Sequence, residues 1–336
     1  QTLEKPTGDA RLIYFKRWLR HNEQSGASAR SYIYAQYARA MKFLYEKEFL
    51  VRDDSRAPTP AAATGSLYQN RGHSTDTQIE ANYAVYVALA ITKAQLGAQQ
   101  TLKNVLIVGP GLDFAPRTDL IDVFEPQSYQ PFAAADAILG LGLADRKQLR
   151  IHSIDINDRV VDYLQNFSAR KVKRLSLLSG VADTARQQLT ADYQDFFAAL
   201  GRNIGAPSQL AGMPANYPQR LGKSINIDDD VGRLLSAEKL NIITERYDPA
   251  PRYDLVIVTN VFPYFSDAEL LLALSNIASM IAEGGHLIHN ESRPVLSALT
   301  EKLKLRLLHS RQVLISSNKN QPLYDRVYVH QKPERF

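Results

Sequence analysis

The chain has no cysteine among its 336 residues. Disulfide bonds, thiolate zinc sites and cysteine nucleophiles are therefore excluded. It also has no apolar run long enough to span a bilayer, so we expect no membrane span. The chain begins at Gln1 and not at Met, which indicates a processed or trimmed start; removal of a signal peptide would produce it, and so would an expressed fragment.

The chain also has only a small excess of positive over negative charge. The formal net charge is +5, and the densest basic cluster, 171–174, is short. A short cluster is typical of a solvated surface, so we expect no nucleic-acid partner. His286 and His289 are three apart in a strand-like segment, where side chains alternate between faces, and so they make a poor metal pair. With 45% hydrophobic and 22% charged residues, the composition is that of a globular protein with a sizeable core.

Strand-like and helix-like stretches alternate from residue 104 onward. The strand-like stretches are 104–108, 149–154, 253–259 and 284–290, and helical apolar stripes cover about 131–141, 158–167, 270–281 and 295–303. This alternation predicts an α/β fold with a Rossmann-like, mostly parallel sheet. Two closing strands, about 305–316 and 324–330, have too short a connection for a parallel crossover, so the final strand should be antiparallel.

Two other regions surround this pattern. Residues 1–100 have helical apolar spacing and are predicted to form an N-terminal helical cap region. Residues 101–336 would form the Rossmann-like domain, with an insertion at about 170–240 that shapes or covers a site. A strand-like stretch also ends at 245–248. The polar loop 71–76, which holds His73, either caps the site or only caps the helix that follows it.

The most informative motif is a glycine turn. The buried-strand pattern Val105–Val108 runs directly into Gly109-Pro-Gly111, which lets a ligand approach the backbone closely. In an open α/β sheet, ligands bind beyond the carboxyl ends of the strands. A dinucleotide fingerprint needs a third glycine that opens a helix, but Asp113 stands in that place. The turn therefore favours a ligand without a pyrophosphate.

A carboxylate stands at the end of the second predicted strand. Asp155 there can accept hydrogen bonds from both hydroxyls of a ribose, and its charge disfavours a bound phosphate. It is alternatively a helix N-cap, but Asn157 or Asp158 can fill that role. We therefore interpret Asp155 as a ribose-binding residue.

Four segments in this order resemble the class I S-adenosylmethionine-dependent methyltransferases. They are the glycine-rich Val105–Gly111, the acidic Ile154-Asp155, the YDLVxxxN-like Tyr253–Asn260, and the turn and strand Glu283–Ile288. The resemblance implies that S-adenosylmethionine binds at this sheet edge. It places the cofactor's amino-acid part over Gly109 and Gly111, its ribose on Asp155, and its adenine beside Ile156 and near Glu245 or Asp248. Thr259 and Asn260 would line the methyl-transfer pocket.

The chain departs from the family pattern in two places. Ile107 occupies the position of a usual acidic residue, and Asp113 replaces the third glycine. Asp113 is therefore a candidate for the missing carboxylate that binds the cofactor's ammonium group. The residues between about 113 and 130 are interpreted as an insertion between the turn and its helix.

The resemblance also sets the expected mechanism. A sulfonium methyl group is already activated, so the protein mainly aligns the acceptor and excludes water. A general base is optional. The candidate catalytic residues are His73, Tyr264, His289 and Glu291. Each histidine also fits an ordinary surface or core position.

We therefore expect a methyltransferase with a small-molecule or protein acceptor. An aminopropyltransferase of the spermidine-synthase type is an alternative, but that family needs acidic residues where Thr259–Pro263 stands. A non-catalytic module that binds S-adenosylmethionine or a nucleoside is a second alternative, and an NAD(P) dehydrogenase is a weaker one. Cofactor supply favours a cytoplasmic protein, while the Gln1 start and the lack of cysteine leave export open.

Overall fold

The computed structural model describes residues 31, 79–95, 101–112, 127–185, 187–210, 219–248, 251–317 and 322–334. The chain divides into two compact units, Gln1–Arg71 and Gly72–Phe336, and every helix and strand given below belongs to the second. Helix α4 (Ile79–Gln95) therefore belongs to the unit that holds the sheet, although the sequence pattern grouped it with the N-terminal helical region.

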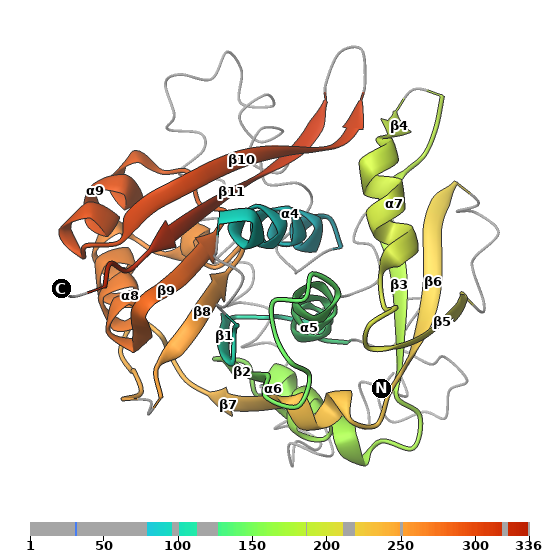
Figure 1. The fold of residues 1–336 in the computed structure, drawn as a ribbon, viewed down its shortest axis with the longest axis horizontal. Helices are drawn as coiled ribbons and strands as arrows, with labels where there is room; N and C mark the ends of the chain where they lie inside the picture. Colours follow the sequence, from blue (N-terminus) through green and yellow to red (C-terminus); the bar gives the residue numbers. More distant parts are fainter. Residues whose placement is uncertain are drawn as a thin grey trace. The chain divides into compact units, whose positions relative to one another are not determined.

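The main sheet of the described residues has eight strands in the order β4-β10-β11-β9-β8-β1-β2-β7 (Figure 1). The parallel strands are β1 (Asn104–Val108), β2 (Arg150–Asp155), β7 (Leu235–Lys239), β8 (Tyr253–Val258) and β9 (Ile281–His289). Strand β11 (Leu323–Gln331) is antiparallel to both of its neighbours, β9 and β10 (Arg306–Ser317), so β10 runs in the same direction as β9. The short β4 (Gln188–Leu189) pairs antiparallel with the other edge of β10. The predicted Rossmann-like α/β fold, with an antiparallel strand pair closing a mostly parallel sheet, is confirmed.

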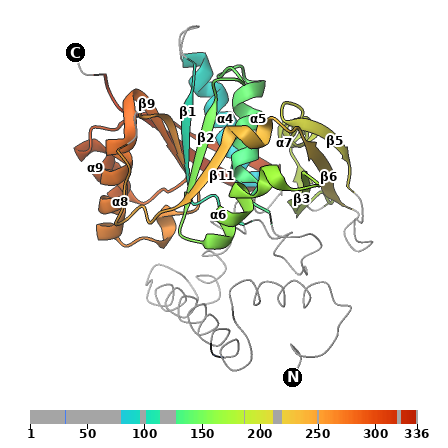
Figure 2. The same cartoon turned by 90° about the horizontal axis from the view of Figure 1, so that it is seen from below.

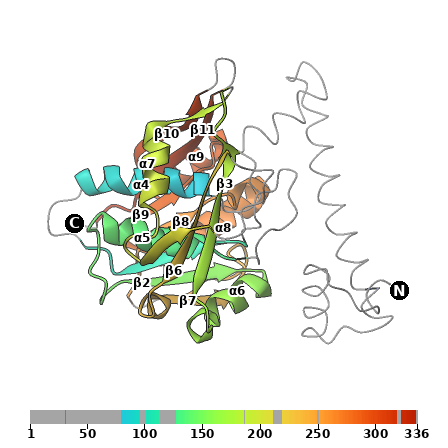
Figure 3. The ribbon, with the colours of Figure 1, turned by 90° about the vertical axis from the view of Figure 1, so that its right-hand side faces the viewer.

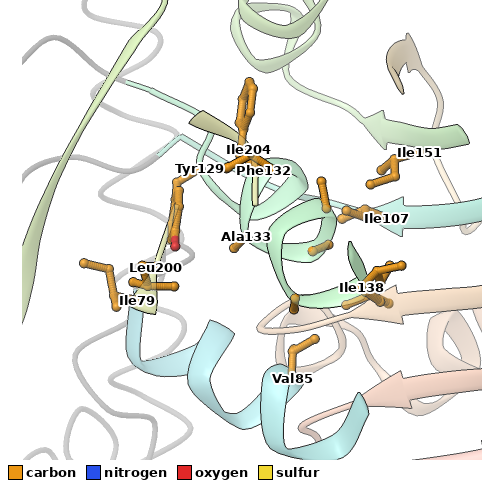
Figure 4. Packing of buried hydrophobic residues seen from close by; sticks show 14 of the residues in the cluster. Ile79, Val85, Ile107, Tyr129, Phe132, Ala133, Ile138, Ile151, Leu200 and Ile204 are labelled. Carbon is orange, nitrogen blue, oxygen red and sulfur yellow. The ribbon is translucent and has the colours of Figure 1, made fainter. Parts of the chain in front are cut away.

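Helices cover both faces of this sheet. Successive side chains of a strand point to opposite faces, so Leu106 and Val108 pack into one core while Val105 and Ile107 pack into another. The first core includes α8 (Asp267–Met280) and α9 (Pro294–Lys302), and the second includes α4, α5 (Gln130–Gly140) and α6 (Asp158–Gln165). Figure 2 shows the two groups on opposite sides of the sheet, and Figure 4 shows Ile107 and Ile151 packed near Ile138 of α5.

The insertion forms a second, smaller sheet beside α5 (Figures 1 and 3). Its antiparallel strands β3 (Arg174–Ala182), β6 (Arg220–Ile227) and β5 (Gly205–Gln209) accompany helix α7 (Ala191–Ala199). The buried carboxylate of Asp136 in α5 accepts hydrogen bonds from the backbone N–H groups of Gly201 (2.6 Å) and Asn203 (2.9 Å). These bonds attach the insertion to the sheet's own helix layer. Short 3-10 helices complete the described chain at Phe167–Ala169, Val231–Leu234 and Phe262–Tyr264.

Two sequence expectations require correction. The insertion ends before 240, because β7 pairs in parallel with β2 as a strand of the main sheet. The strand-like stretch ending at 245–248 is not a strand, because the side chain of Asn241 accepts a hydrogen bond from Ile243 N (3.0 Å) and the segment turns there. The Leu-Ser-Ala-Glu-Lys sequence of β7 has no β-branched residue, so pairing with β2, and not intrinsic propensity, makes it a strand.

Within the described residues, no helix has the length and apolar character needed to cross a membrane.

We predict that His286 makes folding sensitive to acid. Its side chain in β9 is 4% exposed, and burial, with a smaller effect from nearby His309, lowers its pKa from 6.5 to about 4 against the opposing charge of Asp254. The unfolded chain therefore binds a proton before the folded chain does, and stability is lost as the pH falls through this range. Between about pH 7.5 and about pH 5.5 this group alone should remove about 1.3 kcal/mol from the free energy of unfolding.

Urea unfolding of the wild type and of His286→Gln at both pH values measures this effect. Buried carboxyl groups with raised pKa values, such as that of Asp136, act in the opposite direction, so the difference between the two proteins is the informative quantity. Parallel pH profiles for the two proteins would contradict the prediction.

Candidate functional site

Polar residues and glycines gather at the carboxyl edge of the parallel strands. Because β2, β1, β8 and β9 are neighbours and point the same way, the residues at their ends lie side by side. These are Asp155 at the end of β2, Gly109 after β1, Asn260 after β8 and Asn290 after β9. The structure thus brings together three segments that the sequence predicted to share a site.

The glycine turn has the backbone that the motif predicts. Gly109 and Gly111 have φ values of 65° and 69°, in the left-handed region that favours glycine. The N–H of Gly109 donates to the carbonyl oxygen of Ile154 (2.8 Å), and that of Gly111 donates to Oδ2 of Asp155 (3.2 Å). The turn after β1 and the carboxylate at the end of β2 are therefore one connected unit.

Asp155 is not a helix cap. Asn157 fills that role, since its side chain accepts a hydrogen bond from the N–H of Arg159 (3.1 Å) at the start of α6. Oδ1 of Asp155 accepts from Asn157 N (2.8 Å), and burial raises the pKa of Asp155 against the effect of such backbone bonds. A carboxylate oxygen can accept more than one hydrogen bond, so Asp155 retains capacity for ligand hydroxyls. Beside it, Ile156 is 62% exposed, which is unusual for so large an apolar side chain at the end of a buried strand.

Thr259 and Asn260 connect neighbouring elements at the end of β8. Buried Thr259 accepts a hydrogen bond at Oγ1 from Nε2 of Gln130 (2.6 Å), the first residue of α5. Asn260 has a φ of 58°, which asparagine adopts more readily than most residues. Its N–H donates to Oδ1 of Asn290 (2.9 Å), and Nδ2 of Asn290 donates to Oδ1 of Asn260 (2.7 Å). This reciprocal pair joins the ends of β8 and β9.

The segment after β7 does not bring Asp248 to this edge. Oε2 of Glu245 accepts a hydrogen bond from Asn241 N (2.7 Å) and so closes a turn. The ring of Tyr247 then lies 5.5 Å from that of His152, which precedes Asp155 by three residues within β2. The chain has therefore turned back from the carboxyl edge before it reaches exposed Asp248.

Two of the catalytic candidates, His289 and Glu291, are buried and contact other parts of the fold. His289 is fully buried, with its ring stacked on those of Tyr328 (5.1 Å) and His330 (5.0 Å), and burial lowers its pKa well below the usual value. Glu291 is also buried, and its Oε1 accepts hydrogen bonds from the N–H groups of Ser292 (2.7 Å) and Arg293 (3.0 Å) just before α9. His289 therefore packs inside the fold, and Glu291 positions the start of α9.

Tyr264 is placed differently. It ends the 3-10 helix that follows β8 and is half-buried at the carboxyl edge. His73 and Asp113 lie outside the described residues. Among the residues that are described, no group of three or more His, Asp or Glu side chains is arranged to hold a metal ion.

The sequence interpretation missed Gln130 and Asn290. Asn290 directly follows a predicted strand, so the rule that selected Asp155 and Asn260 also selects it. Gln130 bears no such signal, because only the fold brings the start of α5 to Thr259.

No protein-family model and no curated protein matches the chain. Among solved structures, it is similar to the N-methyltransferase NodS from Bradyrhizobium japonicum, crystallised with S-adenosyl-L-homocysteine, at 14% identity and a TM-score of 0.38 over 77% of this chain and 90% of that one. It is also similar to the magnesium protoporphyrin IX methyltransferase ChlM from Synechocystis, at 9% identity and a TM-score of 0.36 over 85% and 93% of the two chains. An O-methyltransferase family protein from Burkholderia thailandensis matches at 10% identity and a TM-score of 0.38 over 91% and 71%. Likeness at this level does not establish an activity.

We predict that Gly109→Ala destabilises the protein more than a matched substitution does. A Cβ at Gly109 would lie 2.6 Å from Cγ2 of Val261, in addition to the cost of a left-handed alanine. Gly142 has nearly the same φ, 64°, but its Cβ would meet only Nζ of Lys93 at 3.6 Å. Gly142→Ala should therefore cost about 1–2 kcal/mol from its backbone alone, and Gly109→Ala should cost more.

Urea unfolding of the two variants measures the difference. Equal losses would show that Val261 moves aside without cost and that the glycine turn is not sterically constrained.

Proposed function

We propose that this chain is a class I S-adenosylmethionine-dependent methyltransferase that acts on a small-molecule or protein acceptor. The observation that carries the proposal is the connected unit at the carboxyl edge, in which the Gly111 N–H binds the carboxylate of Asp155 (3.2 Å) beside the exposed side chain of Ile156. A bare glycine turn, a hydroxyl-binding carboxylate and an apolar surface are the three features that an adenosine-bearing amino acid needs.

The residues present fit this cofactor. Gly109 and Gly111 leave room for its amino-acid part, Asp155 has oxygens for the ribose hydroxyls, and Ile156 offers an apolar contact for the adenine. The same carboxylate disfavours the pyrophosphate of a dinucleotide by charge repulsion. This supports S-adenosylmethionine over NAD(P).

When bound, the cofactor supplies an activated sulfonium methyl group. The chain's own residues would then align the acceptor and exclude water. Buried Thr259, held by Gln130, and Asn260, held by Asn290, give the end of β8 a fixed geometry for that task. Tyr264 is the half-buried candidate at the edge for contact with the acceptor.

Two alternatives fit less well. An aminopropyltransferase needs carboxylates after the strand that corresponds to β8, but here the first acidic residue after that strand is Asp267, within α8. A non-catalytic binding module would share the cofactor site and would differ only in lacking methyl transfer.

We predict that Asp155→Ala weakens cofactor binding by about tenfold to a hundredfold, because hydrogen bonds between a carboxylate and the ribose hydroxyls are lost. Calorimetric titration of S-adenosylmethionine and S-adenosylhomocysteine into the wild type and the variant measures this. Asp155→Asn keeps the shape of the side chain and separates loss of charge from loss of packing.

Asp158→Ala is the matched control. Asp158 is an exposed carboxylate three residues further along, paired with Lys239 (2.9 Å), and its removal should change affinity less than about threefold. Absence of binding to the wild type, or equal affinities for the wild type and Asp155→Ala, would overturn the proposal.

A further inference from the structure

A buried carboxylate at the start of α4 has one oxygen without a hydrogen bond. Glu80 is 7% exposed, and its Oε1 accepts from Ser179 Oγ (3.0 Å), Gly180 N (2.9 Å) and Tyr193 OH (2.8 Å). Its Oε2 is buried and accepts no hydrogen bond. An unsatisfied buried oxygen of this kind is costly, so a donor brought by a ligand would be strongly stabilised there.

A second carboxylate approaches it from β11. Tyr328 pairs with His289, the last residue of β9, so Asp325 lies just beyond the end of β9, level with the loop that follows Asn290. Burial, together with the nearby charge of Glu80, raises the pKa of Asp325 to about 7, although hydrogen bonds from Arg326 N and the Asn290 side chain oppose the shift. Among the described residues, neither carboxylate has an ion-pair partner.

The start of α5 adds further unpartnered polar atoms. Ser128 and Gln130 are 0% and 1% exposed, and neither Oγ of Ser128 nor Oε1 of Gln130 has a hydrogen-bond partner. Between them, Tyr129 points toward Ile79, the neighbour of Glu80 (Figure 4). The orphaned oxygens of Glu80 and Gln130 are acceptors, so they call for a ligand rich in donors.

Asp325 lies along the same carboxyl edge as the proposed cofactor site. Along the carboxyl edge, the order runs from Asp155 on β2 through Gly109 and Asn260 to Asn290 and then Asp325 on β11. The strands β2 and β11 are four strand spacings apart, roughly 19 Å, with the end of β8 between them. The start of α5 reaches the end of β8, since Nε2 of Gln130 binds Thr259 there.

We propose that Glu80 and Asp325 bind the ammonium group of an amine, and that this amine is the methyl acceptor. The inference rests on the proposed function, and it names the acceptor class for that same site. Buried Glu80 and half-buried Asp325 repel each other when both are charged, whereas one ammonium group supplies up to three N–H donors and a compensating charge. A neutral hydroxyl supplies one donor and no charge.

Asp325 can also accept the proton that an ammonium group must lose before methylation. An ammonium nitrogen has no lone pair, so an N–H bond must break before that nitrogen can act as a nucleophile. The electrons of that bond become the nitrogen lone pair, and the proton goes to a carboxylate oxygen of Asp325. Burial raises the pKa of Asp325 above that of an ordinary carboxyl group, which makes this carboxylate a stronger base for the transfer.

Ligand-observed NMR titrations test the proposal with probes that differ only in the charged group. The probes are phenethylamine with 2-phenylethanol and butylamine with butanol, added to protein saturated with S-adenosylhomocysteine. We expect the amines to bind more tightly than the alcohols. We also expect Glu80→Gln and Asp325→Asn to weaken amine binding by about tenfold or more while alcohol binding stays unchanged.

Asp192→Asn is the matched control, because Asp192 precedes Tyr193 in sequence but is exposed on α7, outside the cluster. It should change amine affinity less than about twofold. S-adenosylhomocysteine binding to each variant reports its fold, and if one variant does not fold, the other carries the test.

The outcomes separate the two proposals. If S-adenosylhomocysteine does not bind the wild type, the proposed function fails. If it binds, but amines and alcohols bind equally or the two variants keep wild-type amine affinity, the assignment of Glu80 and Asp325 is overturned while the proposed function stands.

Discussion

Parallel pairing of β1 with β2 on one side and β8 on the other is the constraint on which the site depends. A parallel neighbour must begin again at the same edge, so every crossover returns the chain to the opposite side of the sheet and every strand ends beside the others. The glycine turn, Asp155 and Asn260 are far apart in sequence and still meet for this reason. The buried apolar cores on both faces keep the strands in this register.

Polar contacts then determine how the insertion meets the sheet. Asp136 binds backbone N–H groups of the insertion, and Gln127 exchanges two hydrogen bonds with Ser176 of β3 (2.6 and 2.9 Å). Glu80 does the same at the start of α4 through Gly180 and Tyr193. These bonds join separate layers, and they are directional where apolar packing is not. The insertion thus supplies the three donors that bind Oε1 of Glu80.

The sequence predicts most of the sheet, because strands such as β1 and β8 are continuous apolar runs that end in turn residues. It does not predict β7, whose alternation is weak, since its strand character comes from pairing with β2. Asp155 is predictable from its position at a strand end. Glu80, Gln130 and Asp325 are not, because their importance arises only when α4, α5 and β11 converge. His289 and Glu291 have residue types that are common in catalysis, but both side chains are buried. His289 stacks on neighbouring rings, and Glu291 binds backbone N–H groups before α9.

The contact of Val261 with the turn at Gly109 joins two neighbouring loops sterically. The side chain of Val261, in the loop after β8, limits the space beside Gly109, so the sizes of the two residues depend on each other. Among homologous chains, the size of the residue at position 261 and the presence of glycine at position 109 should therefore vary together. A chain with a bulkier residue at position 109 needs a smaller one at position 261, and such covariation would record this contact in evolutionary history.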